Sequence, residues 1–255
     1  MSRQALLAIV VVAVLQSACG FISTPTPVTI VQTVEVEVTR QITQQVTREV
    51  VVTATAEPTA TATPEPRLIF EEAFETSDSE WNTEDSPEAS IHISDGRLII
   101  EVHSSQRNMY ANHPELELLD AYVLDVDLSY ISGPTGAEAG IAFRCSQEGE
   151  EWLQVSIDAD SLFAVARITP QETELESTDV IPWVRLAALR RGSTLNHIQL
   201  IDNSRQVTVS VNGKLVATWP YDTVAPGCPY LFVGTYEEGE AIWAFDNVTV
   251  REIEP

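Results

Sequence analysis

An alternation of apolar and polar side chains over residues 122–130, broken only by Val123, constrains the fold of this chain more than any other feature. The even positions are Tyr, Leu, Val, Leu and Tyr, whereas the odd positions include Asp125 and Asp127. A period of two is typical of a β-strand that packs one face on a core and turns the other to solvent. We therefore expect a half-buried strand here, with both aspartates on its outer side.

Similar strand patterns recur throughout residues 67–255. The other expected strands cover residues 68–74, 91–93, 97–102, 140–146, 152–158, 162–169, 198–201, 207–212, 214–219, 230–235 and 241–252. Asp95-Gly96 and Asn212-Gly213 separate neighbouring strands and are typical of two-residue hairpin turns. Only residues 183–191 look helical. About eleven strands at this spacing predict an all-β, antiparallel, two-sheet sandwich.

Residues 1–19 have the composition of an export signal. A short cationic start precedes an apolar stretch of 11 residues at 5–15, which is too short for the ~20 apolar residues of a spanning helix. Ser17, Ala18 and Cys19 follow, and the segment resembles a bacterial lipoprotein signal, although Leu15 stands four residues before the cysteine instead of three. We predict export and lipid attachment at Cys19, which would anchor the protein to the cell membrane. Simple secretion is the alternative, although Gln16 is unfavourable for the usual cleavage site.

Residues 20–66 form a low-complexity region rich in Thr, Val and Pro. Such a composition cannot bury enough apolar surface to fold alone, so we expect a stalk between the signal and a domain at 67–255. Apolar residues recur every four positions at Val38, Ile42, Val46 and Val50. Pairing of this row with copies in other chains is the alternative interpretation.

The chain is strongly acidic. It has a formal net charge of −24, and residues 67–255 hold 33 of its 38 acidic and 11 of its 14 basic residues. This surface repels phosphate backbones, so we expect no nucleic-acid partner. A solvated exterior explains the charge, and capture of cations by carboxylate clusters is the alternative.

The three cysteines are Cys19, Cys145 and Cys228. If Cys19 carries lipid, the other two form an even remainder in an oxidising compartment, which favours a disulfide between Cys145 and Cys228. Two buried thiols are the alternative. The four histidines are scattered singly, without the spacing of a zinc site.

The order of several segments resembles the concanavalin A-like jelly-roll superfamily. They are residues 70–74 ahead of Trp81, residues 140–144 leading to 152–155, Val211-Asn212-Gly213, and residues 245–250. Within it, the chain is similar to laminin-G-like and 3-keto-disaccharide-hydrolase-like domains. This resemblance implies a fold that carries lectins, glycanases and domains without a known ligand. It also implies that a structural Ca²⁺ could bind near the first and last strands, with Glu71 or Glu72 and Asp246 as local candidates.

Retaining glucanases of this superfamily carry Glu-x-Asp-x-x-Glu on one strand, and no Glu-x-Asp occurs in this chain. Asp125 and Asp127, and likewise Asp158 and Asp160, are better explained as solvent-facing or turn residues. Cleavage of an oxidised disaccharide is an enzymatic alternative that rests on the resemblance alone.

Alternation favours a binding face. Trp152 and Gln154 share one side of their strand, and Arg144 and Arg167 would face outward from the neighbouring strands. We expect these four residues to form a sugar platform; alternatively, Trp152 is an edge of the core and the arginines pair with carboxylates. The predicted function is binding of a glycan or surface polymer, more as a lectin than as an enzyme. The alternatives are hydrolysis of modified (3-keto) disaccharides and a spacer or adhesion module that binds protein.

Overall fold

The computed structural model describes residues 66–76, 79–105, 107–116, 119–145, 151–171, 175–220, 227–236 and 239–254. The predicted signal segment with Cys19 and the predicted stalk up to residue 65 lie outside the described residues. Among the described residues, none belongs to a helix that is long and apolar enough to cross a membrane.

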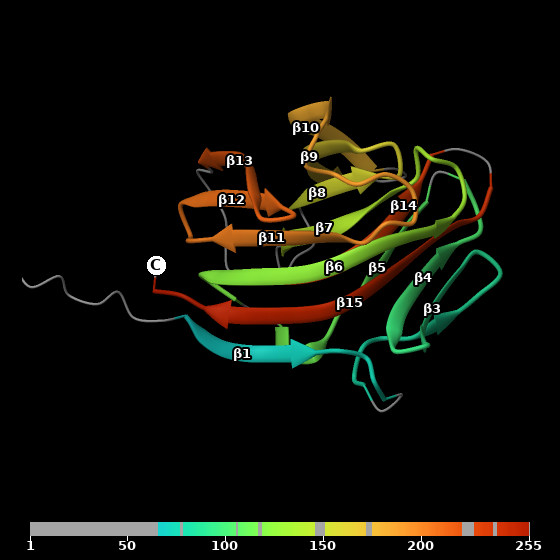
Figure 1. Ribbon diagram of the computed structural model, residues 1–255, viewed down its shortest axis with the longest axis horizontal. Coiled ribbons are helices and arrows are strands. Elements are labelled where there is room, and N and C mark those ends of the chain that lie inside the picture. Colours follow the sequence, from blue (N-terminus) through green and yellow to red (C-terminus); the bar gives the residue numbers. More distant parts are fainter. Residues whose placement is uncertain are drawn as a thin grey trace, which may run out of the picture. The chain divides into compact units, whose positions relative to one another are not determined.

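The described chain is built almost entirely from strands (Figure 1). They are β1 (Arg67–Glu72), β2 (Glu84–Asp85), β3 (Ala89–Ser94), β4 (Arg97–Val102), β5 (Arg107–Ala111), β6 (Tyr122–Ser132), β7 (Glu138–Cys145), β8 (Trp152–Asp158), β9 (Leu162–Pro170), β10 (Leu175–Arg185), β11 (Asn196–Asp202), β12 (Gln206–Val211), β13 (Lys214–Pro220), β14 (Cys228–Thr235) and β15 (Ala241–Glu252). A single 3₁₀ turn, Pro114–Leu116, follows β5. The all-β fold class predicted from the sequence is confirmed.

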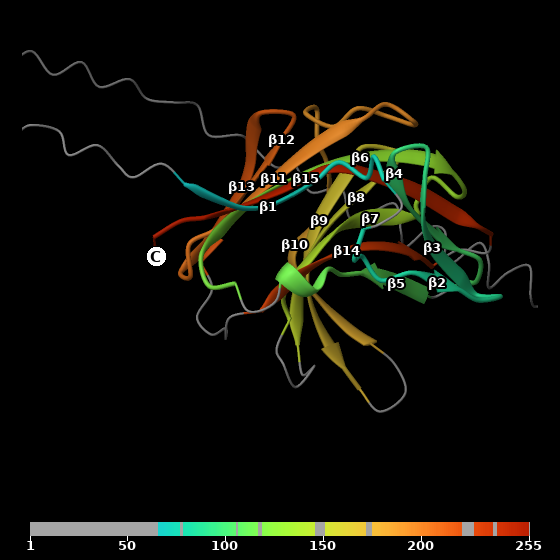
Figure 2. The same cartoon turned by 90° about the horizontal axis from the view of Figure 1, so that it is seen from below.

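The strands form two antiparallel sheets that lie face to face (Figure 2). The nine-stranded sheet has the order β13-β12-β11-β6-β15-β4-β3-β2, with β1 also paired to β15. The six-stranded sheet has the order β10-β9-β8-β7-β14-β5. Strands far apart in the sequence, such as β6 and β15, are neighbours, which confirms the predicted two-sheet sandwich.

The core lies between the sheets and follows the predicted alternation. Tyr122, Leu124 and Val126 of β6 are at most 1% exposed. From the opposite sheet, Ile141 and Val155 join the same core cluster. Burial of these faces is the main driving force that holds the two layers together.

Both predicted hairpin turns are present. Asp95 and Gly96 have φ of 51° and 69°, and Asn212 and Gly213 have φ of 49° and 75°. Positive φ at both central residues is the requirement of a type I′ turn, which Asn-Gly and Asp-Gly satisfy at low cost.

The predicted helical character of residues 183–191 was wrong. Residues 183–185 end β10, an edge strand whose residues are exposed except for the half-buried Ile181. A strand that contributes so little to the core shows no clear alternation, and its Pro182 is tolerated because edge strands need not donate every ladder hydrogen bond.

Candidate functional site

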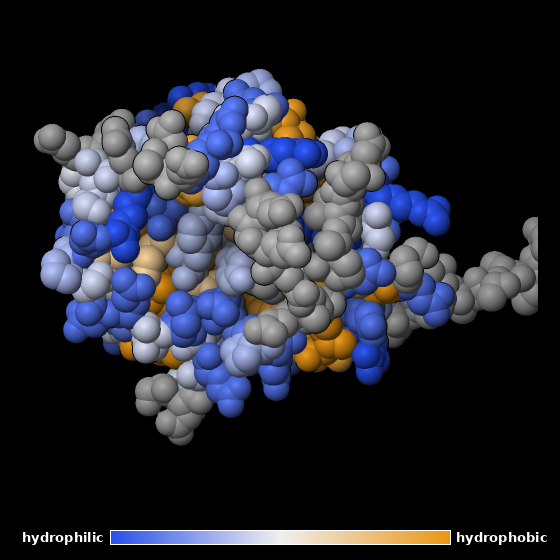
Figure 3. Space-filling view, turned by 180° about the vertical axis from the view of Figure 1, so that it is seen from behind, coloured by the Kyte–Doolittle hydropathy of each residue, from blue (hydrophilic) through white to orange (hydrophobic). Residues whose placement is uncertain are grey.

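The outer face of the six-stranded sheet carries two of the four residues that the sequence placed in a binding site, Trp152 and Gln154. Leu153, Val155 and Ile157 of β8 point into the core. Alternation therefore places Trp152 and Gln154 on the opposite side of the same strand. Figure 3 shows the side of the molecule behind that of Figure 1, where the described side chains are mostly hydrophilic with smaller hydrophobic areas between them.

Strand register arranges this face in rows. One row pairs Tyr110 with Phe232, Phe232 with Gly140, and Gly140 with Ser156. The next row pairs Tyr230 with Ala142 and Ala142 with Gln154, and a third pairs Gly234 with Glu138 and Glu138 with Asp158. Aromatic residues from β5 and β14 thereby lie beside polar residues from β7 and β8.

Four rings form what we call the aromatic cluster: Tyr110, Trp152, Tyr230 and Phe232. The Tyr110 ring centroid lies 5.8 Å from that of Trp152, 6.4 Å from that of Tyr230 and 5.9 Å from that of Phe232. Phe232 is fully buried, whereas the other three are half-buried. The indole Nε1 of Trp152 has no hydrogen-bond partner among the described residues. The cluster therefore combines apolar ring surface with an uncommitted donor.

Polar side chains continue from this cluster along what we call the polar chain: Asn108, Tyr110, Gln154 and Ser156. The Asn108 amide donates to the Tyr110 hydroxyl at 3.3 Å, and that hydroxyl donates to Gln154 Oε1 at 3.4 Å. Gln154 Nε2 donates to Ser156 Oγ at 3.4 Å. These are long, weak hydrogen bonds. Gln154 and Ser156 are only 1% and 2% exposed, so Asn108 and Tyr110 are the members of the chain that a ligand would meet first.

Glu138 is a buried carboxyl group beside the polar chain and is 3% exposed. Burial raises its pKa, since removal from water disfavours the charged form. Ser156, Tyr236 and Gln154 offset part of this rise by hydrogen bonding, and the charge of Asp158 adds to it. Glu138 is therefore the described group on this face best suited to carry a proton.

Asp158, opposite Glu138, has a structural role that the sequence predicted. Its Oδ1 accepts the backbone N–H of Asp160 at 3.0 Å and that of Leu162 at 2.7 Å. These bonds hold the turn between β8 and β9.

The prediction that Arg144 faces outward was wrong. It is 1% exposed, and its Nε and NH2 groups donate to the two carboxylate oxygens of Asp202 at 2.5 and 2.6 Å. The backbone of Arg144 has φ of 55°, a left-handed conformation that breaks the alternation at the end of β7.

The prediction that Arg167 faces outward was also wrong, because it pairs with the core-facing Leu153. Arg167 is half-exposed and forms an ion pair with Glu151 at 3.3 Å, as the alternative interpretation expected. A small hollow is lined by Arg144, Glu151, Trp152, Leu153 and Arg167. The structure thus brings Arg144, Trp152 and Arg167 together, whereas Gln154 belongs to the polar chain.

The carboxylates expected near a structural Ca²⁺ accept hydrogen bonds from their own loops. Glu72 accepts the backbone N–H of Phe74 at 2.8 Å and the hydroxyl of Ser79 at 2.7 Å. Asp246 accepts the backbone N–H of Asn247 at 2.7 Å, and burial is the main cause of its raised pKa. Among the described residues, the His and carboxylate group with metal-ligand proximity is elsewhere, at the end of β4.

The register of β7 and β14 places Cys145 directly opposite Cys228. Residues opposite each other on neighbouring antiparallel strands have Cα atoms about 4.5–5.5 Å apart, within the range that a disulfide spans. The disulfide stays a prediction that this register supports.

The site predicted from the sequence did not include Glu138, Tyr230 or Phe232. A signal for Glu138 was present, because Ala139, Ile141 and Phe143 alternate as core residues and leave Glu138 on the outer side. The aromatic cluster depends on pairing between β5, β14 and β7, which no local pattern reveals.

No family model matches the chain, and no curated protein matches it. Several solved structures match the chain. The catalytic domain of an endo-1,3-β-glucanase (laminarinase) from Thermotoga petrophila is 11% identical over 75% of this chain and 99% of its own, with a TM-score of 0.52. A protein of unknown function with a galectin-like fold from Bacillus subtilis is 14% identical over 75% of this chain and 99% of its own, with a TM-score of 0.54.

A structure from work on endo-acting O-glycanases of the human gut microbiota is 9% identical over 74% of this chain and 100% of its own, with a TM-score of 0.54. At these identities the likeness establishes the fold alone. It agrees with the two-sheet β-sandwich that the described residues form.

Proposed function

We propose that the outer face of the six-stranded sheet binds a glycan. The observation that carries this proposal is the aromatic cluster lying directly beside the polar chain, with Tyr110 belonging to both. Binding sites for small ligands combine apolar walls with a few placed polar groups. Sugars need this combination, because their C–H faces stack on rings while their hydroxyls form hydrogen bonds.

Gly140 and Gly234 lie on this face where a side chain would collide with its neighbours. A Cβ atom at Gly234 would lie 2.1 Å from Asn108 Oδ1, so a side chain there would displace a member of the polar chain. One at Gly140 would lie 1.9 Å from the carbonyl oxygen of Val155 and 3.2 Å from the Phe232 ring, so glycine allows the close approach of β8 beside the aromatic cluster.

The negative charge of the domain disfavours anionic ligands. With 33 acidic and 11 basic residues in 67–255, the domain repels anions at long range. Of the two arginines predicted for the platform, Arg144 is paired with Asp202 and Arg167 with Glu151. We therefore expect a neutral glycan rather than an acidic one.

The test is calorimetric titration of the protein with neutral and acidic glycans. Laminarin and mucin O-glycans are included because solved structures of similar fold come from proteins named for these polymers. Saturable binding of a neutral glycan supports the proposal, whereas binding restricted to acidic glycans contradicts its charge argument.

Hydrolysis of a modified (3-keto) disaccharide is the second candidate. One observation favours it: Glu138, whose pKa is raised by burial, lies directly across the strands from Asp158. Retaining glycosidases use carboxyl groups about 5–5.5 Å apart, one of which has a raised pKa. If this candidate is right, Glu138→Gln abolishes turnover of such a disaccharide but preserves binding; turnover that persists in this variant contradicts it.

We also propose that the protein is exported and anchored to the cell membrane by lipid on Cys19. The support is the composition of residues 1–19, followed by the Thr, Val and Pro-rich region that would act as a stalk. Stable anchoring takes more than one acyl chain, as a lipoprotein cysteine provides. The sandwich would then meet its ligand at the bacterial surface.

A further inference from the structure

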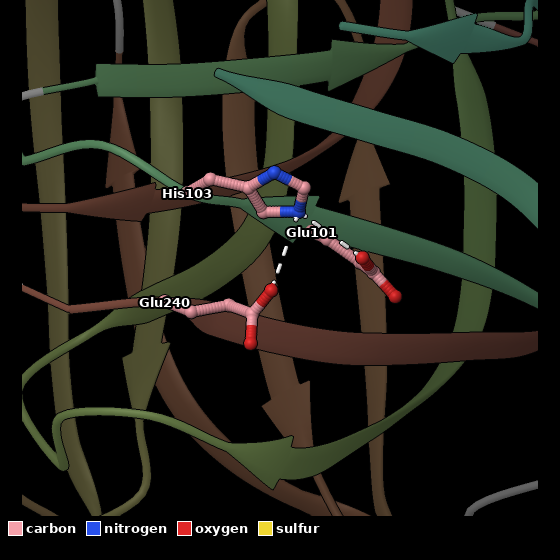
Figure 4. Close-up of side chains that lie close together, drawn as sticks. All are labelled: Glu101, His103 and Glu240. Atoms are coloured by element: carbon pink, nitrogen blue, oxygen red, sulfur yellow. Dashed lines mark hydrogen bonds and ion pairs between the residues drawn. The ribbon is translucent and has the colours of Figure 1, made fainter. Parts of the chain in front are cut away.

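A second group of polar side chains lies on the other sheet, at the end of β4 (Figure 4). Glu101 and His103 are two positions apart and so project from the same side of the chain. Glu240 directly precedes β15, whose Ala241 pairs with Val102. Strand pairing therefore brings Glu240 beside the other two residues, although it is distant in the sequence.

The three side chains converge on one point. His103 Nε2 lies 3.1 Å from Glu101 Oε2 and 3.3 Å from Glu240 Oε1, and the three atoms lie within 4.8 Å of one another. A tetrahedral zinc ion with bonds of about 2.0–2.2 Å holds its ligand atoms about 3.3 Å apart. The two separations from His103, 3.1 and 3.3 Å, are close to those that such an ion requires.

Backbone contacts hold this group in place. The N–H of His103 donates to the carbonyl of Glu88 at 2.8 Å. A Cβ atom at Gly133 would lie 2.4 Å from the carbonyl oxygen of Glu240, so the chain packs closely behind that glutamate. The group is therefore held by strand pairing and loop contacts rather than by flexible side chains alone.

The group is also accessible and electrostatically suited to a cation. The side chains of His103, Glu101 and Glu240 are 29%, 23% and 54% exposed. Two carboxylates, Glu101 and Glu240, share the single imidazole of His103. This leaves a local excess of negative charge in a domain that already attracts cations.

A hollow adjoins the group on the same sheet. It is lined by Thr83, Glu84, Asp85, Ser90, Ile91 and His92. Ser90 pairs directly with Glu101 across β3 and β4. A ligand in this hollow would lie beside any ion held by the three side chains.

We propose that Glu101, His103 and Glu240 bind Zn²⁺ as three protein ligands and leave a fourth position open. Imidazole and carboxylate together suit Zn²⁺, whereas Ca²⁺ takes six to eight oxygen ligands. The fourth position faces solvent and would accept water or a donor from the adjoining hollow. This site is separate from the aromatic cluster, which lies on the outer face of the other sheet.

The experiment titrates the metal-stripped full-length protein with Zn²⁺ in the presence of a competing chelator. We expect one saturable equivalent that excess Ca²⁺ does not displace. His103→Ala and Glu240→Gln should each weaken binding at least about tenfold, because even outer-sphere partners of metal ligands are worth that much. Zn²⁺ should raise the Tm of the wild type and not that of His103→Ala, since binding to the folded state stabilises it.

His197→Asn is the matched control. His197 also lies between two carboxylates, Asp127 at 2.9 Å and Asp125 at 3.2 Å, but it contacts them through different ring nitrogens. Three ligand atoms do not converge there, so this variant should keep wild-type affinity. The proposal is overturned if Zn²⁺ does not bind, if Ca²⁺ displaces it, or if His103→Ala, folded as judged by circular dichroism, binds it as tightly as the wild type.

Discussion

Arg144 of β7 and Asp202 of β11 form a two-point ion pair that connects the two sheets. Nε of Arg144 lies 2.5 Å from Oδ2 of Asp202, and NH2 lies 2.6 Å from Oδ1. The side chains are 1% and 0% exposed, and the guanidinium also donates to the carbonyl of Asp120. A residue expected to meet ligand thus instead fixes how the layers sit together.

Removal of Arg144 should destabilise the fold severely. Arg144→Met leaves the Asp202 carboxylate buried without its cation, which typically costs about 3–5 kcal/mol. The double variant Arg144→Met/Asp202→Leu should recover much of this loss, because it leaves no buried charge. Urea unfolding of the full-length variants measures both effects, with the exposed Arg205→Met as a control. A loss below about 1 kcal/mol in the single variant would contradict the buried pair.

Glu138 should make stability depend on pH. Its pKa is raised above the ordinary value of 4.5, so the folded state holds the proton more tightly than the unfolded state. The resulting stabilisation is fully present below pH 4.5 and is lost as pH rises through the raised pKa. Wild type should therefore lose stability relative to Glu138→Gln as the pH rises above 4.5.

The comparison between these two proteins isolates Glu138 together with its electrostatic coupling to Asp158, because the raised pKa of Asp246 acts equally in both. The measurement is the free energy of unfolding in urea at several pH values. Parallel curves for wild type and Glu138→Gln would show that Glu138 titrates as an ordinary surface carboxyl.

A disulfide should join Cys145 and Cys228 in the exported protein. Their opposition in the register of β7 and β14 brings the two backbones close enough for the bond. Mass spectrometry of peptides without reductant should recover the linked pair, and Cys145→Ser should release one reactive thiol from Cys228. Labelling of both thiols in the unreduced, denatured wild type would contradict this prediction.

Cys19 should decide whether the protein is bound to the membrane. In cells fed labelled palmitate, wild type should carry label and sediment with membranes, whereas Cys19→Ser should carry none. Cys145→Ser serves as the control, since it should stay labelled. Label on Cys19→Ser would show that this cysteine is not the attachment site.

Much of the fold could be predicted because alternation and turn dipeptides are local signals. The bounds of β4, β8 and β15 agree with the predicted strands at 97–102, 152–158 and 241–252. β5 was missed because it is short and buries only Met109 and Ala111, and β10 was missed because nearly all of its residues are exposed. Which strand neighbours which was not predictable from any local pattern.

The site was only partly predictable for the same reason. Trp152 and Gln154 follow from alternation within one strand, but their partners Tyr110 and Tyr230 come from strands that are neighbours only in the folded sheet. The predicted placement of Arg144 failed because its positive φ ends the alternation at that residue. Local periodicity therefore identifies a face but not the residues that neighbouring strands bring to it.

The central claim is that the aromatic cluster binds a neutral glycan, and calorimetry of the full-length protein tests it most directly. Wild type should bind at least one neutral glycan, and both Tyr110→Ala and Trp152→Ala should weaken that binding at least about tenfold, since each removes a stacking ring from the apolar wall. Trp183→Ala, which removes an exposed ring on β10 outside the cluster, should bind as wild type does. Absence of binding to every glycan, or equal binding by all four proteins, would contradict the claim and direct attention to protein partners.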